Sequence, residues 1–305
     1  MVFLYKDSGR VHSLRQSYLK LNSRQQLPIG VFDSGCGGLT VLKELQARLP
    51  RETFLYVGDT ANVPYGTQSQ ANILHYSRQI LDWMTQYPVK MAIMACNTSS
   101  ALALDAVRSE FKIPILGIIL PGARAAAIQG KRIGVLATPA TVASESYPKA
   151  ILEKNPQAEV FQVACPEFVP LIESNRIHEA ETVAIVQERL QPLLEAQIDT
   201  LVYGCTHYPH LAPVVEALLP PSVQAVNPAV RMAAATAQEL EILQLQTHQR
   251  PQRPRFFVSG CPQQFAQLSQ QWLGRQPWVE QVNFSSSSLT ETVPLVEAAT
   301  DRIVL

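Results

Sequence analysis

Two cysteines of this sequence share the same kind of surroundings, where an apolar run gives way to polar side chains. Cys96 lies in the segment AIMACNTS and Cys205 in the segment LVYGCTHY. A cysteine thiol has an unperturbed pKa of about 8.5, so it can act as an acid or as a base near neutral pH. Two such groups on opposite sides of a substrate can remove a proton from one face of a carbon atom and return one to the other face. The pair therefore predicts acid–base chemistry that inverts a stereocentre.

A single free cysteine would not support this prediction, because free cysteines are usually buried and behave as small apolar side chains. That interpretation is kept for Cys165 and Cys261, and also for Cys36, although Cys36 lies in a glycine-rich loop. Cys96 and Cys205 differ because they occupy equivalent positions in an internal repeat.

The repeat is visible as short segments of similar sequence in the two halves of the chain. The matched pairs are 29–31 with 133–135, 57–59 with 163–165, 89–98 with 198–207, and the strand near 113 with the strand near 223. The nearly constant offset between the members of each pair argues against chance. Each half therefore places one cysteine at the same point of its sequence pattern.

The elements that must position these cysteines form a regular alternation. Short β-branched runs followed by helix-period segments are typical of βα units around a parallel sheet. The first unit is clear, with a strand at 29–32, a turn at 33–38 and a helix at 39–49. Further strands are expected at 54–58, 91–95, 114–118, 132–136, 158–163, 199–204, 223–226 and 255–259.

The predicted fold class is α/β, with two similar parallel-sheet domains related by pseudo-symmetry. Open parallel sheets bind ligands beyond the carboxyl ends of their strands, so the active site is expected in the cleft between domains that face each other. The expected division is an N-terminal extension at 1–27, a first domain at 28–123 plus 234–283, a second domain at 124–233 and a C-terminal tail at 284–305. The extension and the serine-rich stretch from Ser285 are expected to be surface additions or poorly ordered.

Polar residues at the strand ends could assist the two thiols. Asp33 and His207 are the candidates by position, because a thiol needs a neighbour that favours its ionisation or carries its proton. Asp33 could instead cap a helix, and His207 could be a buried histidine with a structural role. The loop at 35–38 opens a helix, where backbone N–H groups could hold a substrate carboxylate, but a tight turn explains it equally well.

Composition and motif content exclude several other function classes. The 25 basic and 25 acidic residues balance, so no charge surplus favours nucleic acid or an anionic membrane. Charged residues interrupt the apolar stretch near the N-terminus, so we do not expect a secretory signal. The sequence has no apolar run long enough to span a membrane, and its five cysteines form no CxxC pair. A cytoplasmic protein that acts on a small molecule is therefore expected.

The sequence also argues against bound cofactors and metals. It has neither GxGxxG nor a phosphate-binding GxxxxGK[ST] motif, and no lysine lies at an apolar strand end where a pyridoxal Schiff base would be expected. A zinc site built from Cys205 and His207 would lack a compact second pair of ligands. We therefore expect no cofactor and no metal.

Several ordered motifs between Pro28 and Arg231 carry a family resemblance. They are GVFDSG from Gly30, VGDT from Val57, PYG from Pro64, ACNT from Ala95, CP from Cys165 with FVP from Phe168, and GCTHYP from Gly204. With these motifs the chain resembles the glutamate racemases of the aspartate/glutamate racemase superfamily. The resemblance implies reversible interconversion of L- and D-glutamate without cofactor or metal, which supplies D-glutamate for peptidoglycan synthesis in the bacterial cytoplasm. We also expect a homodimer.

The resemblance further implies roles for individual residues. Cys96 would remove or return the α-proton of D-glutamate, assisted by Asp33. Cys205 would do the same for L-glutamate, assisted by Glu173 and His207. The implied substrate contacts are Asp33, Ser34, Tyr65, Gly66, Asn97, Thr98, Thr206 and His207, with Thr138 and Thr141 as further candidates for the carboxylates. The sequence departs from the family pattern at Cys36, where a small aliphatic residue is usual, which leaves a third thiol near the site.

Two other interpretations remain open from the sequence. Aspartate racemase shares the paired cysteines but holds a shorter side chain, and relative rates on the two amino acids distinguish it. A catalytically silent binding protein of the same fold would have lost a cysteine, whereas both are present.

Overall fold

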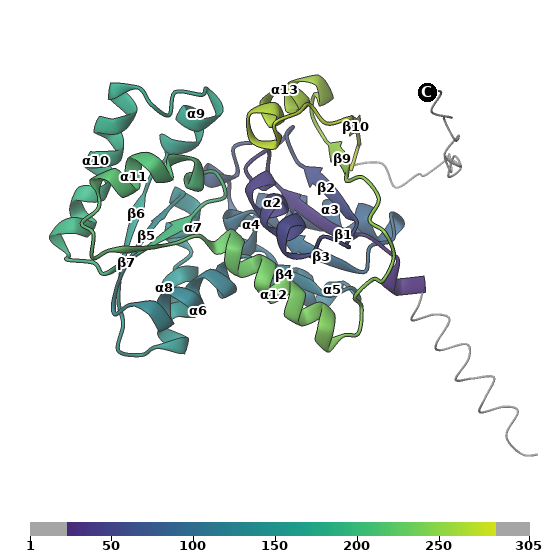
Figure 1. Cartoon of the computed structure of the whole chain (residues 1–305), viewed down its shortest axis with the longest axis horizontal. Helices are drawn as coiled ribbons and strands as arrows, with labels where there is room; N and C mark the ends of the chain where they lie inside the picture. Colours follow the sequence, from purple (N-terminus) through teal and green to yellow (C-terminus); the bar gives the residue numbers. More distant parts are fainter. Residues whose placement is uncertain (1–22, 285–305) are drawn as a thin grey trace, which may run out of the picture.

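The computed structural model describes residues 23–284, which form two parallel β-sheets with helices packed on their faces (Figure 1). The first sheet has the order β10-β9-β2-β1-β3-β4, and the second has the order β6-β5-β7-β8. The strands of the first sheet are β1 (Ile29–Asp33), β2 (Phe54–Gly58), β3 (Met91–Met94), β4 (Ile115–Gly117), β9 (Arg255–Val258) and β10 (Val279–Gln281). Those of the second are β5 (Arg132–Ala137), β6 (Glu159–Ala164), β7 (Thr200–Gly204) and β8 (Gln224–Val226).

Helices connect the strands throughout, as a parallel sheet requires. They are α2 (Leu39–Arg48), α3 (Gln70–Gln86), α4 (Asn97–Leu102), α5 (Leu104–Glu110), α6 (Ile119–Gln129), α7 (Pro139–Ala143), α8 (Ser146–Lys154), α9 (Phe168–Glu173), α10 (Ala180–Glu195), α11 (Ala212–Leu218), α12 (Pro228–Ile242) and α13 (Pro262–Leu273), with short 3₁₀ turns η1 (Tyr65–Thr67) and η2 (Tyr208–Leu211). Within residues 23–284, no helix combines the length and the apolarity needed to cross a membrane.

The predicted α/β fold and its repeat are confirmed. All nine expected strands are present, and the order β2-β1-β3-β4 in the first sheet is repeated by β6-β5-β7-β8 in the second. Every pair of neighbouring strands in both sheets is parallel. The sequence analysis missed β10, because a three-residue strand with one valine and two polar residues carries no clear pattern.

The division into domains stays a prediction, and two helices cross its expected boundaries. The boundary at 123–124 falls within α6, and the one at 233–234 falls within α12. The expectations for residues 1–22 and 285–305 lie outside the described residues.

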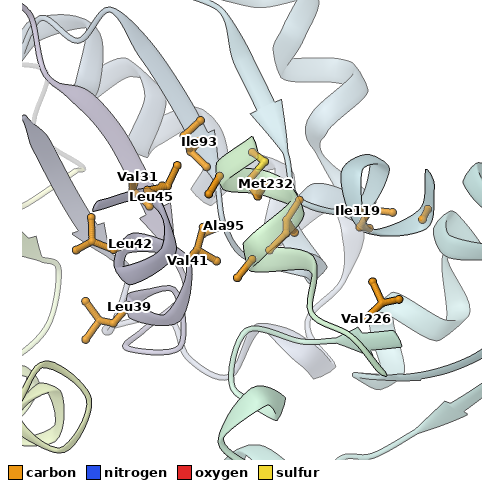
Figure 2. Packing of buried hydrophobic residues seen from close by; sticks show 14 of the residues in the cluster. Val31, Leu39, Val41, Leu42, Leu45, Ile93, Ala95, Ile119, Val226 and Met232 are labelled. Atoms are coloured by element: carbon orange, nitrogen blue, oxygen red, sulfur yellow. The ribbon is translucent and has the colours of Figure 1, made fainter. Parts of the chain in front are cut away.

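A continuous apolar core joins the two sheets. The buried cluster that contains Leu42 and Leu45 of α2 and Val31 of β1 also contains Val135 and Val226 of the second sheet. Figure 2 shows part of this cluster, in which α12 lies between the side chains of α2 and those near the second sheet. Because α12 packs against both α2 and α6, its apolar side chains connect the two halves of the molecule.

A buried ion pair fixes the start of the strand that leads to Cys96. The Nζ atom of Lys90 lies 2.5 Å from a carboxylate oxygen of Glu52, and both side chains are almost fully buried. The same Nζ donates hydrogen bonds to the backbone carbonyls of Gln25 at 2.9 Å and Leu245 at 2.8 Å. Lys90 therefore ties three separate segments to the beginning of β3.

We predict that Lys90→Met lowers the free energy of unfolding by about 3–5 kcal/mol, because it leaves the Glu52 carboxylate buried without its partner. The control is Arg78→Met, which breaks the ion pair of Arg78 with Glu110 at the surface and should cost no more than about 1 kcal/mol. Urea unfolding followed by circular dichroism measures both. Equal losses in the two variants would contradict the role assigned to Lys90.

Candidate active site

The carboxyl ends of β1, β3 and β7 open onto one cavity of about 490 Å³ between the two sheets. Its lining includes most of the residues named from the sequence: Ser34, Tyr65, Gly66, Cys96, Asn97, Thr98, Thr138, Glu173, Cys205, Thr206 and His207. Asp33 and Thr141 are fully buried behind this lining and contact it through Thr206 and Thr98. The two cysteines of the repeat therefore meet at one cavity, one from each half.

A hydrogen-bonded chain of side chains supports Cys205. Its Sγ lies 3.9 Å from Nδ1 of His207, and Nε2 of the same ring lies 3.1 Å from Oε1 of Glu173. Burial lowers the pKa of His207, but hydrogen bonds with Cys205, Cys36 and Glu173 outweigh it and hold this pKa well above its usual value. Burial raises the pKa of Glu173, and the hydrogen bond to His207 reverses that shift. An imidazolium at this place can stabilise a thiolate on Cys205.

Cys96 has a different environment. It lies between β3 and α4, with its Sγ 4.0 Å from Oγ of Ser34. Burial, the nearby charge of Asp33 and, as a smaller effect, charge on Cys205 together raise the pKa of Cys96 to about 11. The second thiol is therefore close enough to influence the first, which favours one protonated and one ionised sulfur over two thiolates.

Asp33 is held by groups from both halves of the chain. One carboxylate oxygen accepts a hydrogen bond from the backbone N–H of Gly35 at 3.0 Å, and the other accepts one from Oγ1 of Thr206 at 3.2 Å. Burial raises the pKa of Asp33, against the lowering effects of His207 and of these hydrogen bonds. The amide of Gly35, considered above for a substrate carboxylate, is thus used by the protein's own carboxylate.

The glycine-rich loop makes a very close contact with the other half of the site. A Cβ atom on Gly37 would overlap the His207 ring and Oγ1 of Thr206. Thr40 strengthens the same contact, because its hydroxyl donates to the carbonyl of Thr206 at 2.9 Å. The absence of a side chain at Gly37 therefore allows the second half to approach the loop closely.

Residues with hydroxyl and amide groups line another part of the cavity. Oγ1 of Thr98 lies 3.0 Å from Oγ1 of Thr138, whose hydroxyl lies 2.9 Å from that of Thr141. The Tyr147 hydroxyl donates to Oδ1 of Asn97 at 2.7 Å, while the buried Nδ2 of Asn97 has no hydrogen-bond partner in the described part of the chain. Asn97 lines the cavity, and a buried donor without a partner is a feature that calls for an explanation such as a bound ligand.

Sequence reasoning missed part of the site that comes from far along the chain. Gln264 and Leu268 of α13 line the cavity, and Trp272 of the same helix stacks on His210 and meets the edge of the His207 ring. No motif marks these residues. Their only signal is the apolar periodicity of a helix that follows β9.

A third thiol also belongs to this region. Sγ of Cys36 lies 3.5 Å from Oε1 of Glu173, and burial raises the pKa of Cys36 to about 11. One ligand atom each from Cys36, Glu173 and His207 lies within 4.8 Å of the other two. The zinc interpretation considered for the sequence paired His207 with Cys205, whereas the structure brings a different cysteine and a carboxylate to the other side of the ring.

Comparisons with known proteins agree with this geometry. Residues 29–237 match the model of the Asp/Glu/Hydantoin racemase family. Glutamate racemase of Picosynechococcus is 58% identical over 266 residues, which cover 87% of this chain and 95% of the relative. That of Rippkaea orientalis is 60% identical over 263 residues, covering 86% of this chain and 94% of the relative.

Solved structures give the same result. The glutamate racemase isoform RacE1 of Bacillus anthracis superposes with a TM-score of 0.82 at 35% identity, covering 85% of this chain and 98% of that one. The enzyme of Francisella tularensis in complex with D-glutamate gives 0.81 at 33% identity, covering 86% and 99%. The chain is therefore a member of the Asp/Glu/hydantoin racemase family. Within that family, the two relatives described above, at 58% and 60% identity, are glutamate racemases.

We predict that Glu173→Gln lowers the pKa of His207, because the variant removes the negative charge that favours the imidazolium and keeps the length of the side chain. Nitrogen-15 NMR titration of the imidazole measures this directly. Glu167→Gln is the matched control, since Glu167 pairs with Arg189 and not with His207. A pKa that is the same in Glu173→Gln and the wild type would refute the assigned coupling.

Proposed function

We propose that this chain is a glutamate racemase that works by two-base proton transfer between Cys96 and Cys205. The observation that carries the proposal is that the two thiols, equivalent by the repeat, line one cavity from different halves of the chain. The identity of 58–60% to glutamate racemases over most of the chain supports glutamate as the substrate.

The reaction needs one thiolate and one thiol at a time. With L-glutamate, the Cys205 thiolate takes the α-proton, so that the Cα–H bond breaks and an S–H bond forms. The electron pair left on Cα is delocalised into the α-carboxylate. The Cys96 thiol then donates its proton to the opposite face, which yields D-glutamate and a thiolate on Cys96. The reverse direction exchanges the roles of the two sulfurs.

Polar neighbours give each thiol its own support. His207, held by Glu173, can stabilise the Cys205 thiolate and exchange a proton with it through Nδ1. Asp33 and Ser34 lie on the side of Cys96, and Asp33 acts from behind the cavity wall as a positioning and electrostatic group. General acid–base catalysis of this kind contributes roughly 10²–10⁴-fold to a rate.

Neutral donors are proposed to hold the substrate carboxylates. Asn97, Thr98 and Thr138 line the cavity, and the hydroxyls of the two threonines lie 3.0 Å apart. Thr206 lines the cavity next to Cys205. No lysine or arginine is present among the described residues that line the cavity. Tyr65, Gly66 and Ser34 complete the proposed contacts, while Thr141 acts through the other threonines.

The wider biological role follows from this activity. We propose that the enzyme supplies D-glutamate for peptidoglycan synthesis in the cytoplasm, uses no cofactor or metal in catalysis, and works as a homodimer of two-domain subunits. Aspartate is the alternative substrate, and it would place its side-chain carboxylate one methylene closer to Cα.

The first test of the function is loss of the α-proton NMR signal of L-glutamate in D₂O, followed together with optical rotation. Dialysed protein without added cofactor should exchange the proton and racemise glutamate, and it should act on L-aspartate at least roughly tenfold more slowly, as one methylene in a pocket implies. Faster exchange with aspartate would transfer the assignment to aspartate racemase. Absence of α-proton exchange with both amino acids would favour a catalytically silent binding protein.

The two-base assignment predicts that Cys96→Ala and Cys205→Ala each abolish racemisation in both directions, a loss of at least roughly 10²–10⁴-fold in kcat. Each direction fails because one sulfur must remove a proton and the other must supply one. Cys261→Ala removes an exposed thiol outside the main cavity and should keep the wild-type rate. Substantial racemisation by either of the first two variants would disprove the assignment.

A further inference from the structure

The thiol of Cys36 has no part in the proposed reaction, yet it touches the groups that support Cys205. Its Sγ is 3.5 Å from Oε1 of Glu173, the same oxygen that lies 3.1 Å from Nε2 of His207. The three side chains come from the β1–α2 loop, α9 and the turn after β7. A thiol, a carboxylate and an imidazole thus converge from separate parts of the chain.

This donor set and its spacing match a zinc site with three protein ligands. Zinc binds sulfur at about 2.3 Å and nitrogen or oxygen at about 2.0–2.2 Å, so tetrahedral ligands lie roughly 3.3–3.6 Å apart. The Sγ–Oε1 separation of 3.5 Å and the Oε1–Nε2 separation of 3.1 Å are close to this range, and all three ligand atoms lie within 4.8 Å of one another. A metal placed among these atoms would replace the existing hydrogen bonds with only small movements of the side chains.

We infer that Cys36, Glu173 and His207 form an inhibitory binding site for a thiophilic divalent cation, with Zn²⁺ as the representative ion. On binding, two protons leave to solvent: the S–H bond of Cys36 is replaced by a Zn–S bond, and the Nε2–H bond of the His207 imidazolium is replaced by a Zn–N bond. A Glu173 oxygen completes the protein ligands. Water takes the open position. No electron is transferred in this step.

The site also borders a second cavity that adjoins the main one. A small cavity of about 80 Å³ is lined by Cys36, Glu173, Cys261 and Gln264 among others. Glu173 lines both this cavity and the larger one. A cation can therefore approach Cys36 and Glu173 without first passing between Cys96 and Cys205.

Occupation of this site would stop turnover, and this part of the inference rests on the proposed function. The metal takes Nε2 of His207, the atom through which Glu173 holds the ring, and leaves Nδ1 facing Cys205. The imidazole can then no longer gain and lose a proton with Cys205 in each cycle. Racemisation should fall in both directions, since both directions use Cys205.

The first experiment measures metal binding without any substrate. Chelator-treated full-length protein is titrated with Co²⁺, whose bond to a thiolate gives a near-ultraviolet charge-transfer absorption. One equivalent should produce this band in the wild type and in Cys261→Ser, and the band should be absent in Cys36→Val. The valine restores the small aliphatic residue that is usual in the resembling family, so this variant should still fold and racemise. A band that persists in Cys36→Val, or that disappears in Cys261→Ser, would overturn the site.

The second experiment tests inhibition with Zn²⁺ in the α-proton exchange assay. Zinc should inhibit the wild type and Cys261→Ser alike, a chelator should restore the rate, and Cys36→Val should need at least roughly 10–100-fold more zinc, a loss as large as that from disrupting the outer shell of a metal site. Equal sensitivity of Cys36→Val and wild type would overturn the inference, as would binding of Co²⁺ without any inhibition by Zn²⁺. An enzyme inactive on every amino acid tested would refute the proposed function and leave the cobalt result to decide the site.

Discussion

The active site depends on one buried contact between the two halves of the chain, the hydrogen bond from Thr206 to Asp33. Asp33 ends a central strand of the first sheet, and Thr206 follows Cys205 at the end of the equivalent strand of the second. Without this bond, one oxygen of the buried carboxylate would lose the donor that the second half supplies, while the other oxygen keeps the Gly35 amide. That loss would be costly, which favours the spacing of the two halves that keeps the bond. Gly37 permits this approach, because any side chain there would overlap His207.

The repeat explains why the two thiols face one cavity, and the departures from the repeat explain why they are not equivalent. Cys96 follows β3, which pairs with β1, and Cys205 follows β7, which pairs with β5. The two cysteines therefore lie at the carboxyl ends of equivalent strands. Cys205 has His207 and Glu173 beside it, whereas Cys96 has a hydroxyl and the buried charge of Asp33. A symmetric scaffold thus carries two thiols with different supports.

The strands, their repeat and the two cysteines could be predicted from sequence because each rests on a local pattern of apolar and polar residues. The partners of these residues could not, since they depend on how elements far apart in the chain meet. Gln264 and Leu268 of α13 line the cavity, and no sequence motif indicates that this helix contributes to the site. The amide of Gly35 was open to a substrate carboxylate on sequence grounds, and only the packing shows that Asp33 occupies it.

The thiol of Cys36 is compatible with the proposed catalysis, and by the inference above it also provides a ligand for an inhibitory metal ion. Burial raises the pKa of Cys36 to about 11, so the side chain stays a neutral thiol beside Glu173 and adds no charge to the Cys205 side of the site. A neutral thiol of this size fills the space that an aliphatic side chain would fill. A thiophilic cation displaces the thiol proton of Cys36 and leaves a thiolate bound to the metal. The same cation then also coordinates His207 and Glu173. The residue therefore leaves the proton-transfer chemistry intact until a metal arrives, and it makes the Cys205 side of the cavity the more sensitive of the two.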